Sequence, residues 1–355
     1  MSFKRRVIAA IVCLVLILGV TACGASNGSS PSTASPSGSK ANDTPASANV
    51  SDFKMTIRLG NLSAVTEPPN LAAQYFADKV KERTNGRIEV NVFPSATIGS
   101  EIEMIESMQT GMLEMAFINS ATLTNFTDTY DVGLLPFLFA DRNEAYKLYD
   151  SEVGDEMLAS LSGIGLKGLT HFENGMRYLI NSKKAVVSPA DLKGLKIRTM
   201  QSEWHLKSFE TMGANPTPMA WGDVYTSLQQ KVIDGCEIPL TAMVDNKVFE
   251  VCGYMTMTGH FYCPYVAMMS QSIWNTIPEA DQAIIQEAII EARDYQREIS
   301  IEKDEAAMAT LRASIDVTEE INIEEWRAAV KPVYEEFNKK FGPEKLARVQ
   351  EVVAR

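Results

Sequence analysis

The sequence predicts an α/β protein built from two lobes, and two patterns predict it. Between residues 55 and 270, segments with the two-residue alternation of strands are interleaved with segments that have the spacing of helices, and this order favours an α/β fold. From Pro278 to about Arg312 no Gly or Pro interrupts the chain, and apolar residues recur on one face. With Pro278 in its first turn, such a helix would be about 50 Å long at 1.5 Å per residue. Because this length exceeds one small domain, we expect the helix to bridge two lobes.

The first two helices expected in the folded body have clear signals at one end. Apolar residues of 71–83 recur at helical spacing, and the pair Asn85 and Gly86 is a plausible stop. Ser100 and Glu103 form a capping box, which predicts a helix that runs to about residue 110. The expected strands are 55–59, 87–93, 112–118, 167–172, 177–181, 195–199, 234–238, 254–262 and 265–270, and the other expected helices are two or three between 119 and 161, then 203–212 and 223–231.

Residues 1–22 have the three parts of an export signal. Lys4, Arg5 and Arg6 form a basic start, and residues 7–20 form an apolar run that is too short to span a bilayer as a helix. Small residues follow, so the segment predicts a signal peptide. Cys23 comes directly after it and resembles the lipidated Cys of the bacterial lipoprotein lipobox, which implies an extracytoplasmic, membrane-anchored protein. The alternative is a plain signal peptide followed by an incidental Cys.

Residues 24–52 consist almost entirely of small and polar residues. Such a segment buries too little apolar surface to offset the entropy of ordering it, so we expect a disordered tether between the lipid and the folded body. Three cysteines remain in that body, Cys236, Cys252 and Cys263. They form either one disulfide and one free thiol or three free buried thiols.

The net charge of −12 argues against two kinds of partner. Nucleic acid and anionic lipid surfaces are both bound through basic patches, which an acidic chain lacks. An anionic ligand is still possible, because one buried Arg can outweigh a distant acidic surface.

Motifs of catalysis and cofactor binding are missing or misplaced. Residues 163–168 match G-x-G-x-x-G, but they follow an expected helix and precede a strand, the reverse of a dinucleotide site. The three histidines form no H-E-x-x-H, and there is no C-x-x-C. The sequence therefore predicts no cofactor, no metal and no enzymatic activity.

Several segments, taken in order, carry a family resemblance. They look like the DctP family, the extracytoplasmic receptors of tripartite ATP-independent periplasmic (TRAP) transporters. The match extends from residue 55 to about 310, and Asp191 to Arg198 (DLKGLKIR) is its most telling run. The other matching runs are 84–94 (TNGRIEVNVFP), 98–101 (IGSE), 111–115 (GMLEM), 135–139 (LPFLF), 173–177 (ENGMR), 213–225 (GANPTPMAWGDVY) and 232–237 (VIDGCE).

The resemblance implies a ligand site with a basic clamp. Arg198 stands where the family grips a carboxylate, and a guanidinium offers a planar fork of donors for that purpose. Arg177 stands where a second basic contact is common, and Trp221 where an aromatic side chain flanks the ligand. The alternatives are a structural salt bridge for Arg198, a surface position for Arg177 and a core position for Trp221.

Weaker candidates come from the same resemblance. His171 and Phe172 either line the cleft or pack beneath it, and Glu101 and Ser120 are candidates from the first lobe. Ile238 replaces an Asn that often contacts the ligand, so we expect fewer polar contacts at that position.

The resemblance also implies the fold and function: a two-lobed, periplasmic-binding-protein-like fold with a hinge, which closes around a small organic acid and delivers it to integral membrane subunits. The alternatives are a receptor of an ABC-type importer or a chemosensor, and a secreted enzyme. The expected parts are the signal peptide (1–22), the lipidated tether (23–52), lobe I (53–174 and 264–300), lobe II (175–263 and 301–330) and the C-terminal helices (331–355).

Overall fold

The computed structural model describes residues 52–354. The expected signal peptide, lipidated Cys23 and all but the last residue of the tether lie outside these residues. The described chain builds two β-sheets. The first has the order β2 (Ile88–Phe93), β1 (Met55–Gly60), β3 (Met115–Asn119), β10 (Tyr265–Ser270), β4 (Leu166–Phe172). The second has the order β11 (Asp316–Thr318), β9 (Tyr254–Tyr262), β5 (Met176–Asn181), β8 (Gly235–Ile238), β6 (Lys196–Thr199), β7 (Asn215–Pro218).

Both sheets mix parallel and antiparallel pairs. In the first, β1 is parallel to β2 and β3, and β10 is antiparallel to β3 and β4. In the second, β5 is antiparallel to β8 and β9, while β6 is parallel to β7 and β8. We call the first sheet with the helices packed on it lobe I, and the second sheet with its helices lobe II.

Helices connect and cover these strands. They are α1 (Pro68–Arg83), α2 (Glu101–Gln109), α3 (Ser120–Leu123), α4 (Arg142–Tyr149), α5 (Glu152–Ser160), α6 (Glu203–Thr211), α7 (Val224–Gln229), α8 (Leu240–Asp245), α9 (Gln271–Trp274), α10 (Glu279–Ser314), α11 (Ile323–Ala329), α12 (Lys331–Phe341) and α13 (Pro343–Ala354), with short 3-10 turns η1 (Asp131–Leu134), η2 (Leu161–Ile164), η3 (Pro189–Leu192), η4 (Trp221–Asp223) and η5 (Val248–Glu250). The expected capping box of α2 is present: the Ser100 side chain accepts from the Glu103 backbone, and the Glu103 side chain accepts from the Ser100 backbone.

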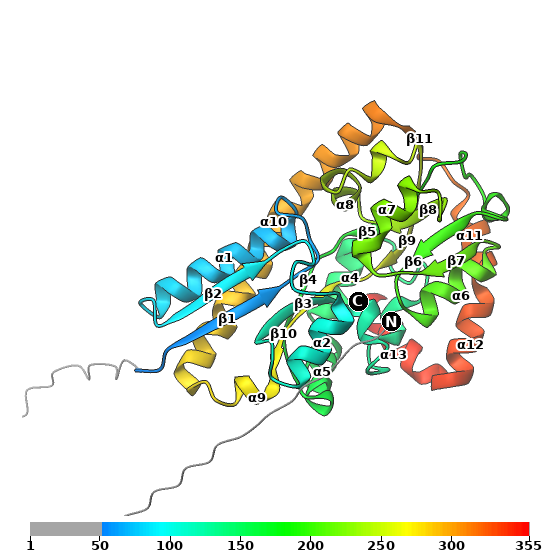
Figure 1. Ribbon diagram of the computed structural model, residues 1–355. Coiled ribbons are helices and arrows are strands. Elements are labelled where there is room, and N and C mark those ends of the chain that lie inside the picture. Colours follow the sequence, from blue (N-terminus) through cyan, green and yellow to red (C-terminus); the bar gives the residue numbers. More distant parts are fainter. Residues whose placement is uncertain (1–51, 355) are drawn as a thin grey trace, which may run out of the picture. The chain divides into compact units, whose positions relative to one another are not determined.

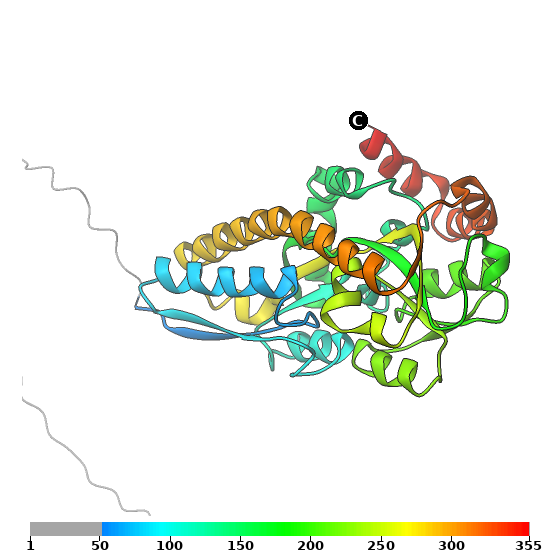
Figure 2. The same cartoon turned by 90° about the horizontal axis from the view of Figure 1, so that it is seen from above.

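The two faces of the lobe I sheet are covered by different helices. Helices α1 and α10 lie side by side over one face (Figures 1 and 2) and pack on Ile57, Leu59 and Phe117. The neighbouring residues Ala116 and Ile118 of β3 belong instead to the core that includes α2. This division follows from strand geometry, because successive side chains point to opposite faces of a sheet.

The chain crosses between the sheets twice, and α10 also spans them. Residues 173–175 join β4 to β5, and residues 263–264 join β9 to β10. Gly175 in the first crossover has φ 75°, a backbone region that favours glycine. Helix α10 has 36 residues and contacts α1 and β4 in lobe I and α8 and β11 in lobe II. The predicted two-lobed α/β fold with a bridging helix is confirmed, although Pro278 precedes the first turn as its N-cap.

The C-terminal helices contact both lobes. Helix α12 packs on α6 of lobe II, where the rings of Trp204 and Phe337 lie 5.4 Å apart. Helix α13 packs on α4, which reaches the lobe I sheet through α5. Cys236, Cys252 and Cys263 are all free and buried, which confirms the second alternative for the thiols.

Candidate functional site

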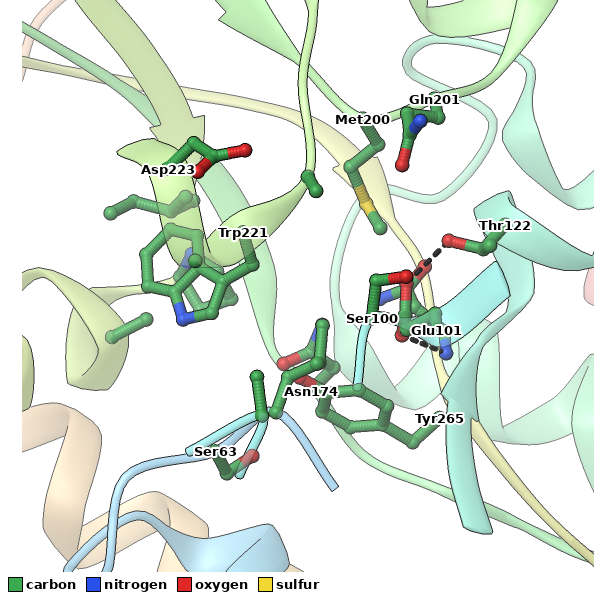
Figure 3. Close-up of a pocket in the computed structure, with 18 of the residues that line it drawn as sticks. Ser63, Ser100, Glu101, Thr122, Asn174, Met200, Gln201, Trp221, Asp223 and Tyr265 are labelled. Atoms are coloured by element: carbon green, nitrogen blue, oxygen red, sulfur yellow. Dashed lines mark hydrogen bonds between the residues drawn. The ribbon is translucent and has the colours of Figure 1, made fainter. Parts of the chain in front are cut away.

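A cavity of about 320 Å³ lies between the lobes and is lined by both. This volume is near the lower end of the range for small-molecule pockets, about 300–1,000 Å³. Figure 3 shows its walls, with Glu101 and Thr122 on one side and Trp221 and Asp223 on the other. Polar and aromatic lining residues include Ser63, Glu67, Ser100, Glu101, Glu103, Asn119, Thr122 and Tyr265 from lobe I, Asn174 from the crossover, and Arg177, Arg198, Gln201, Trp221 and Asp223 from lobe II.

Arg198, on β6, is a buried cation at this cavity. Its Nε and Nη2 atoms donate to the backbone oxygen of Met219 at 3.0 and 2.6 Å. Its guanidinium lies 5.8 Å from the ring centre of Trp221. Burial lowers the pKa of Arg198, but among residues 52–354 no carboxylate forms an ion pair with it. The alternative of a structural salt bridge therefore does not describe this residue, and its guanidinium is available to an anion.

Arg177, on β5, differs from Arg198 because a carboxylate of the protein, that of Glu237, balances its charge. Its Nη2 atom donates to Oε1 of Glu237 at 3.0 Å and to the backbone oxygen of Glu237 at 2.6 Å, and its Nε also pairs with that carboxylate. Both side chains are buried. Arg177 thus lines the cavity as one half of a buried ion pair, so the alternative of a surface position does not describe it.

Glu237 is surrounded by three basic side chains. His205 Nδ1 lies 3.4 Å from its Oε1, and His260 Nε2 lies 3.7 Å from its Oε2. Burial alone would raise the pKa of Glu237, but Arg177 and the histidines hold it well below its usual range. Burial lowers the pKa of His205 and of His260. The carboxylate therefore stays ionised and neutralises Arg177.

Glu101 presents a buried carboxyl group from the first turn of α2. One oxygen accepts from the backbone N–H of Asn119 at 2.6 Å, and the other accepts from the hydroxyl of Thr122. The residue is 6% exposed. Burial raises its pKa to about 7, although the two hydrogen bonds and the charges of Arg198 and Arg177 oppose that shift. Near neutral pH this group accepts hydrogen bonds as a carboxylate and also donates as an acid.

Glu67 is a second buried carboxyl group, and it connects the lobes. It accepts from the backbone N–H of Ala64 at 2.7 Å and from Nδ2 of Asn246, which follows α8 in lobe II, at 2.8 Å. Burial raises its pKa to about 7. Sequence analysis missed Glu67, as it missed Thr122 and Tyr265, because no motif marks them and they meet the arginines only in the folded chain.

Two other predicted residues reach the cavity. Trp221 is half-buried in the turn η4 and faces Arg198, so it is a cavity wall and not a core residue. Ile238, at the end of β8, lines the cavity with an apolar side chain.

Three predicted residues do not line the cavity. His171 is buried away from the lining, with Nε2 3.1 Å from the hydroxyl of Tyr130 and Nδ1 3.2 Å from the backbone oxygen of Tyr149. Phe172 is fully buried and stacks on Phe117 in the core of lobe I. Ser120 is fully buried at the start of α3. The strand direction explains the first two, because alternate residues of β4 enter the cores on either side of the sheet.

The described residues hold neither a metal cluster nor a membrane span. Within residues 52–354 no group of three or more His, Cys, Asp and Glu side chains could hold a metal ion. No helix of that part is both long and apolar enough to cross a bilayer.

Two α/β lobes that enclose a cavity with a buried, unpaired cation define a class of proteins that capture a small ligand between their lobes. The chain belongs to the bacterial extracellular solute-binding proteins of family 7, DctP, whose model matches residues 59–340. This result confirms the family resemblance and favours a receptor over an enzyme.

Named relatives and solved structures agree with that assignment. The chain is similar to the 2,3-diketo-L-gulonate-binding periplasmic protein YiaO of Escherichia coli, with 35% identity over 75% of this chain and 82% of that protein. It also resembles a TRAP periplasmic solute-binding protein from a Polaromonas species bound to D-erythronate (TM-score 0.82, 33% identity, 84% of this chain and 98% of that one). A similar protein from Sulfurospirillum deleyianum has succinate bound (TM-score 0.81, 29% identity, 84% and 99% covered).

Proposed function

We propose that this protein captures a small organic acid in the cavity between its lobes, with the carboxylate of the ligand paired to Arg198. One observation carries the proposal: Arg198 is 3% exposed and forms no ion pair among residues 52–354. A buried charge without a counter-ion is destabilising, and a bound carboxylate would supply that counter-ion. The relatives that bind 2,3-diketo-L-gulonate, D-erythronate and succinate support an organic acid as the ligand.

Binding and closure are coupled in this proposal. The ligand contacts residues of both lobes, so it binds the closed arrangement better than an open one and shifts the population toward closure. Closure also removes water from the pair between Arg198 and the carboxylate, which strengthens their attraction. Trp221 then covers one side of the ligand, and Ile238 offers it an apolar surface.

The test is a thermal-shift assay on refolded, ligand-free protein with a panel of organic acids. A ligand that binds only the native state raises the melting temperature by mass action. We expect a shift with carboxylates in the wild type, none in Arg198→Ala, and a reduced one in Arg198→Lys, which keeps the charge without the planar fork. Arg312→Ala is the control, because Arg312 is paired with Glu319 at an exposed site. A carboxylate shift that persists in Arg198→Ala would disprove the clamp.

The second part of the proposal concerns the ligand's fate. The loaded, closed form passes the acid unchanged to the integral membrane subunits of a TRAP transporter, in keeping with a family of receptors. NMR of the ligand recovered after prolonged incubation should show the starting compound alone. A new product formed by wild type but not by Arg198→Ala would indicate an enzyme.

The third part is membrane anchoring through Cys23. Its support is the order of a basic start, a short apolar run and small residues directly before that Cys. In a bacterial host supplied with labelled fatty acid, the wild type should carry the label and sediment with membranes. Cys23→Ser should lose the label and enter the soluble fraction. Label that remains in Cys23→Ser would show that another residue carries the lipid.

A further inference from the structure

Within residues 52–354, the cavity has one arginine that forms no ion pair with a carboxylate of the protein. Arg177 is neutralised by Glu237, which holds its guanidinium at 3.0 Å and through a second contact at Nε. Arg198 donates to the backbone oxygen of Met219 and lies over the ring of Trp221, and no carboxylate within residues 52–354 forms an ion pair with it. One ligand carboxylate therefore completes the charge balance at the lobe II side of the cavity.

Four acidic residues also line the cavity: Glu67, Glu101, Glu103 and Asp223. Glu101 and Glu67, on the lobe I side, are only 6% and 4% exposed. Glu103 and Asp223 line the same cavity and are exposed at its edge. Figure 3 shows Glu101 and Asp223 on opposite sides of the space that a ligand would fill. A ligand whose carboxylate lies at Arg198 therefore places the remainder of its atoms in a space whose charged side chains, apart from the two arginines, are carboxyl groups.

The carboxyl groups of the lining interact differently with a hydroxyl group of the ligand and with a second ligand carboxylate. A hydroxyl group donates a hydrogen bond to a carboxylate, and a bond to a charged acceptor is among the stronger ones. A second ligand carboxylate has no proton to donate and meets like charge wherever the lining carboxyl groups are ionised, an arrangement that disfavours binding. Ile238 adds no donor to the cavity, and Asn174 and Gln201 offer a second carboxylate neutral amide donors without a positive charge.

We propose that the cavity selects a hydroxylated monocarboxylate and excludes the matching dicarboxylate, and that Glu101 is the main residue responsible for this selectivity. The inference rests on the proposed function and narrows it. Membership of the family does not determine whether the ligand is a monocarboxylate or a dicarboxylate, because one similar protein has D-erythronate bound and another has succinate. The selectivity belongs to the acidic residues that this chain places around Arg198.

The protonation of Glu101 provides a second way to measure the discrimination against a dicarboxylate, because it makes that discrimination depend on pH. Its pKa is about 7, so an acidic medium supplies a proton that a second carboxylate could accept. The titratable and charged groups that face Glu101 are Arg198 and Arg177 from lobe II, and Tyr265 and Cys263. Burial raises the pKa of Tyr265 and of Cys263, so neither ionises between pH 6 and 8. Discrimination against a dicarboxylate should therefore grow as the pH rises through 7.

The experiment uses ligands that differ only at the end remote from Arg198. Calorimetry on ligand-free protein compares each of several four- to six-carbon aldonates with the aldarate of the same configuration, for example galactonate with galactarate, and erythronate with the corresponding tartrate. We expect the tightest aldonate to bind at least about tenfold more tightly than its aldarate at pH 8. In Glu101→Gln the ratio should fall toward one, and its dependence on pH should largely disappear.

The control is Glu106→Gln on the same helix, because Glu106 is exposed and lies outside the cavity. It should leave the selectivity unchanged. Equal or tighter binding of the aldarate by the wild type would overturn the inference and leave the proposed function intact. A failure of every acid to bind would overturn both. If Glu101→Gln does not fold, the pH dependence of the wild-type ratio decides, and a ratio that stays constant between pH 6 and 8 counts against Glu101.

Discussion

At the scale of single residues, Glu237 determines that the two cavity arginines have different roles. It neutralises Arg177, whereas Arg198 forms no ion pair with a carboxylate of residues 52–354 and donates only to the backbone oxygen of Met219. In the sequence both arginines resemble ligand clamps, because nothing near residue 177 shows that its partner is 60 residues away. The pairing becomes visible only when β5 and β8 lie side by side in the second sheet.

Replacing Glu237 with Gln should destabilise the protein strongly. The variant leaves Arg177 as a buried charge without a counter-ion, and breaking a buried pair in this way costs about 3–5 kcal/mol. Urea denaturation of the ligand-free protein measures the change in the free energy of unfolding. Glu250→Gln is the matched control, because its partner Lys247 is 3.9 Å away and both are exposed. A loss as small as that of the control would mean that the buried pair contributes little.

Because the pKa of Glu101 is raised by folding, the difference in stability between the wild type and Glu101→Gln should depend on pH. Its pKa rises from 4.5 in the unfolded chain to about 7 in the folded one. The folded state therefore binds more protons between these values, and stability falls as the pH rises through that window. From pH 4.5 to above 7 the wild type should lose about 3 kcal/mol relative to the variant. Parallel curves of unfolding free energy against pH would contradict the raised pKa.

At the scale of elements, the sequence patterns identified most strands, including the four-residue β6 and β8, and the long helix. Strands β9 and β10 have the predicted bounds, and α10 was predicted from its lack of Gly and Pro. Strand β7 was missed because Pro216 and Pro218 argue against a strand. It forms nonetheless because it is an edge strand, where a missing backbone donor is tolerated.

The side chain of Gln296 on α10 holds the first crossover. Its Oε1 accepts from the backbone N–H of Glu173 at 2.8 Å, and its Nε2 donates to the backbone oxygen of Glu173 at 2.6 Å. The side chain of Glu173 also pairs with Arg142 of α4 at 3.2 Å. The bridging helix therefore fixes the residue directly before Asn174 and Gly175, so those two residues are where we expect the chain to bend on closure.

Gln296→Leu should destabilise the protein and loosen this crossover. The substitution keeps the approximate size but leaves two buried backbone groups without partners, which costs about 1–3 kcal/mol for each group. Hydrogen exchange of the Glu173 amide should accelerate along with the loss of unfolding free energy. Glu298→Ala, an exposed change on the same helix, is the control. Unchanged exchange at Glu173 in Gln296→Leu would refute the role given to this side chain.

At the scale of the whole molecule, the sequence could indicate the lobes but only part of the site. The ordered family motifs and the long helix predict two lobes, and five of the eight predicted ligand residues line the cavity: Arg198, Arg177, Trp221, Glu101 and Ile238. His171 and Phe172 do not, because a motif places a residue on a strand without showing which face it occupies, and Ser120 is buried at the start of α3. Glu67 was missed for a related reason, since its role depends on Asn246 in the other lobe.

Among the described residues, two side-chain hydrogen bonds cross between the lobes beside the cavity, and they should contribute to closure. One joins Glu67 to Asn246 at 2.8 Å, and the other joins Nδ2 of Asn125 to the backbone oxygen of Gln201 at 2.7 Å. Both exist only when the lobes are in contact, so they stabilise the closed form and with it the bound ligand. Each is worth about 1 kcal/mol, so removing both should weaken ligand binding by at least about tenfold.

The double variant Asn125→Ala with Asn246→Ala tests this contribution. Calorimetry should show the loss of affinity, and small-angle X-ray scattering at a fixed subsaturating ligand concentration should show a larger radius of gyration than the wild type, because fewer molecules are closed. Asn143→Ala, at an exposed position of α4, controls for the loss of an amide. Wild-type affinity together with a wild-type radius of gyration would show that contacts with the ligand alone hold the lobes together.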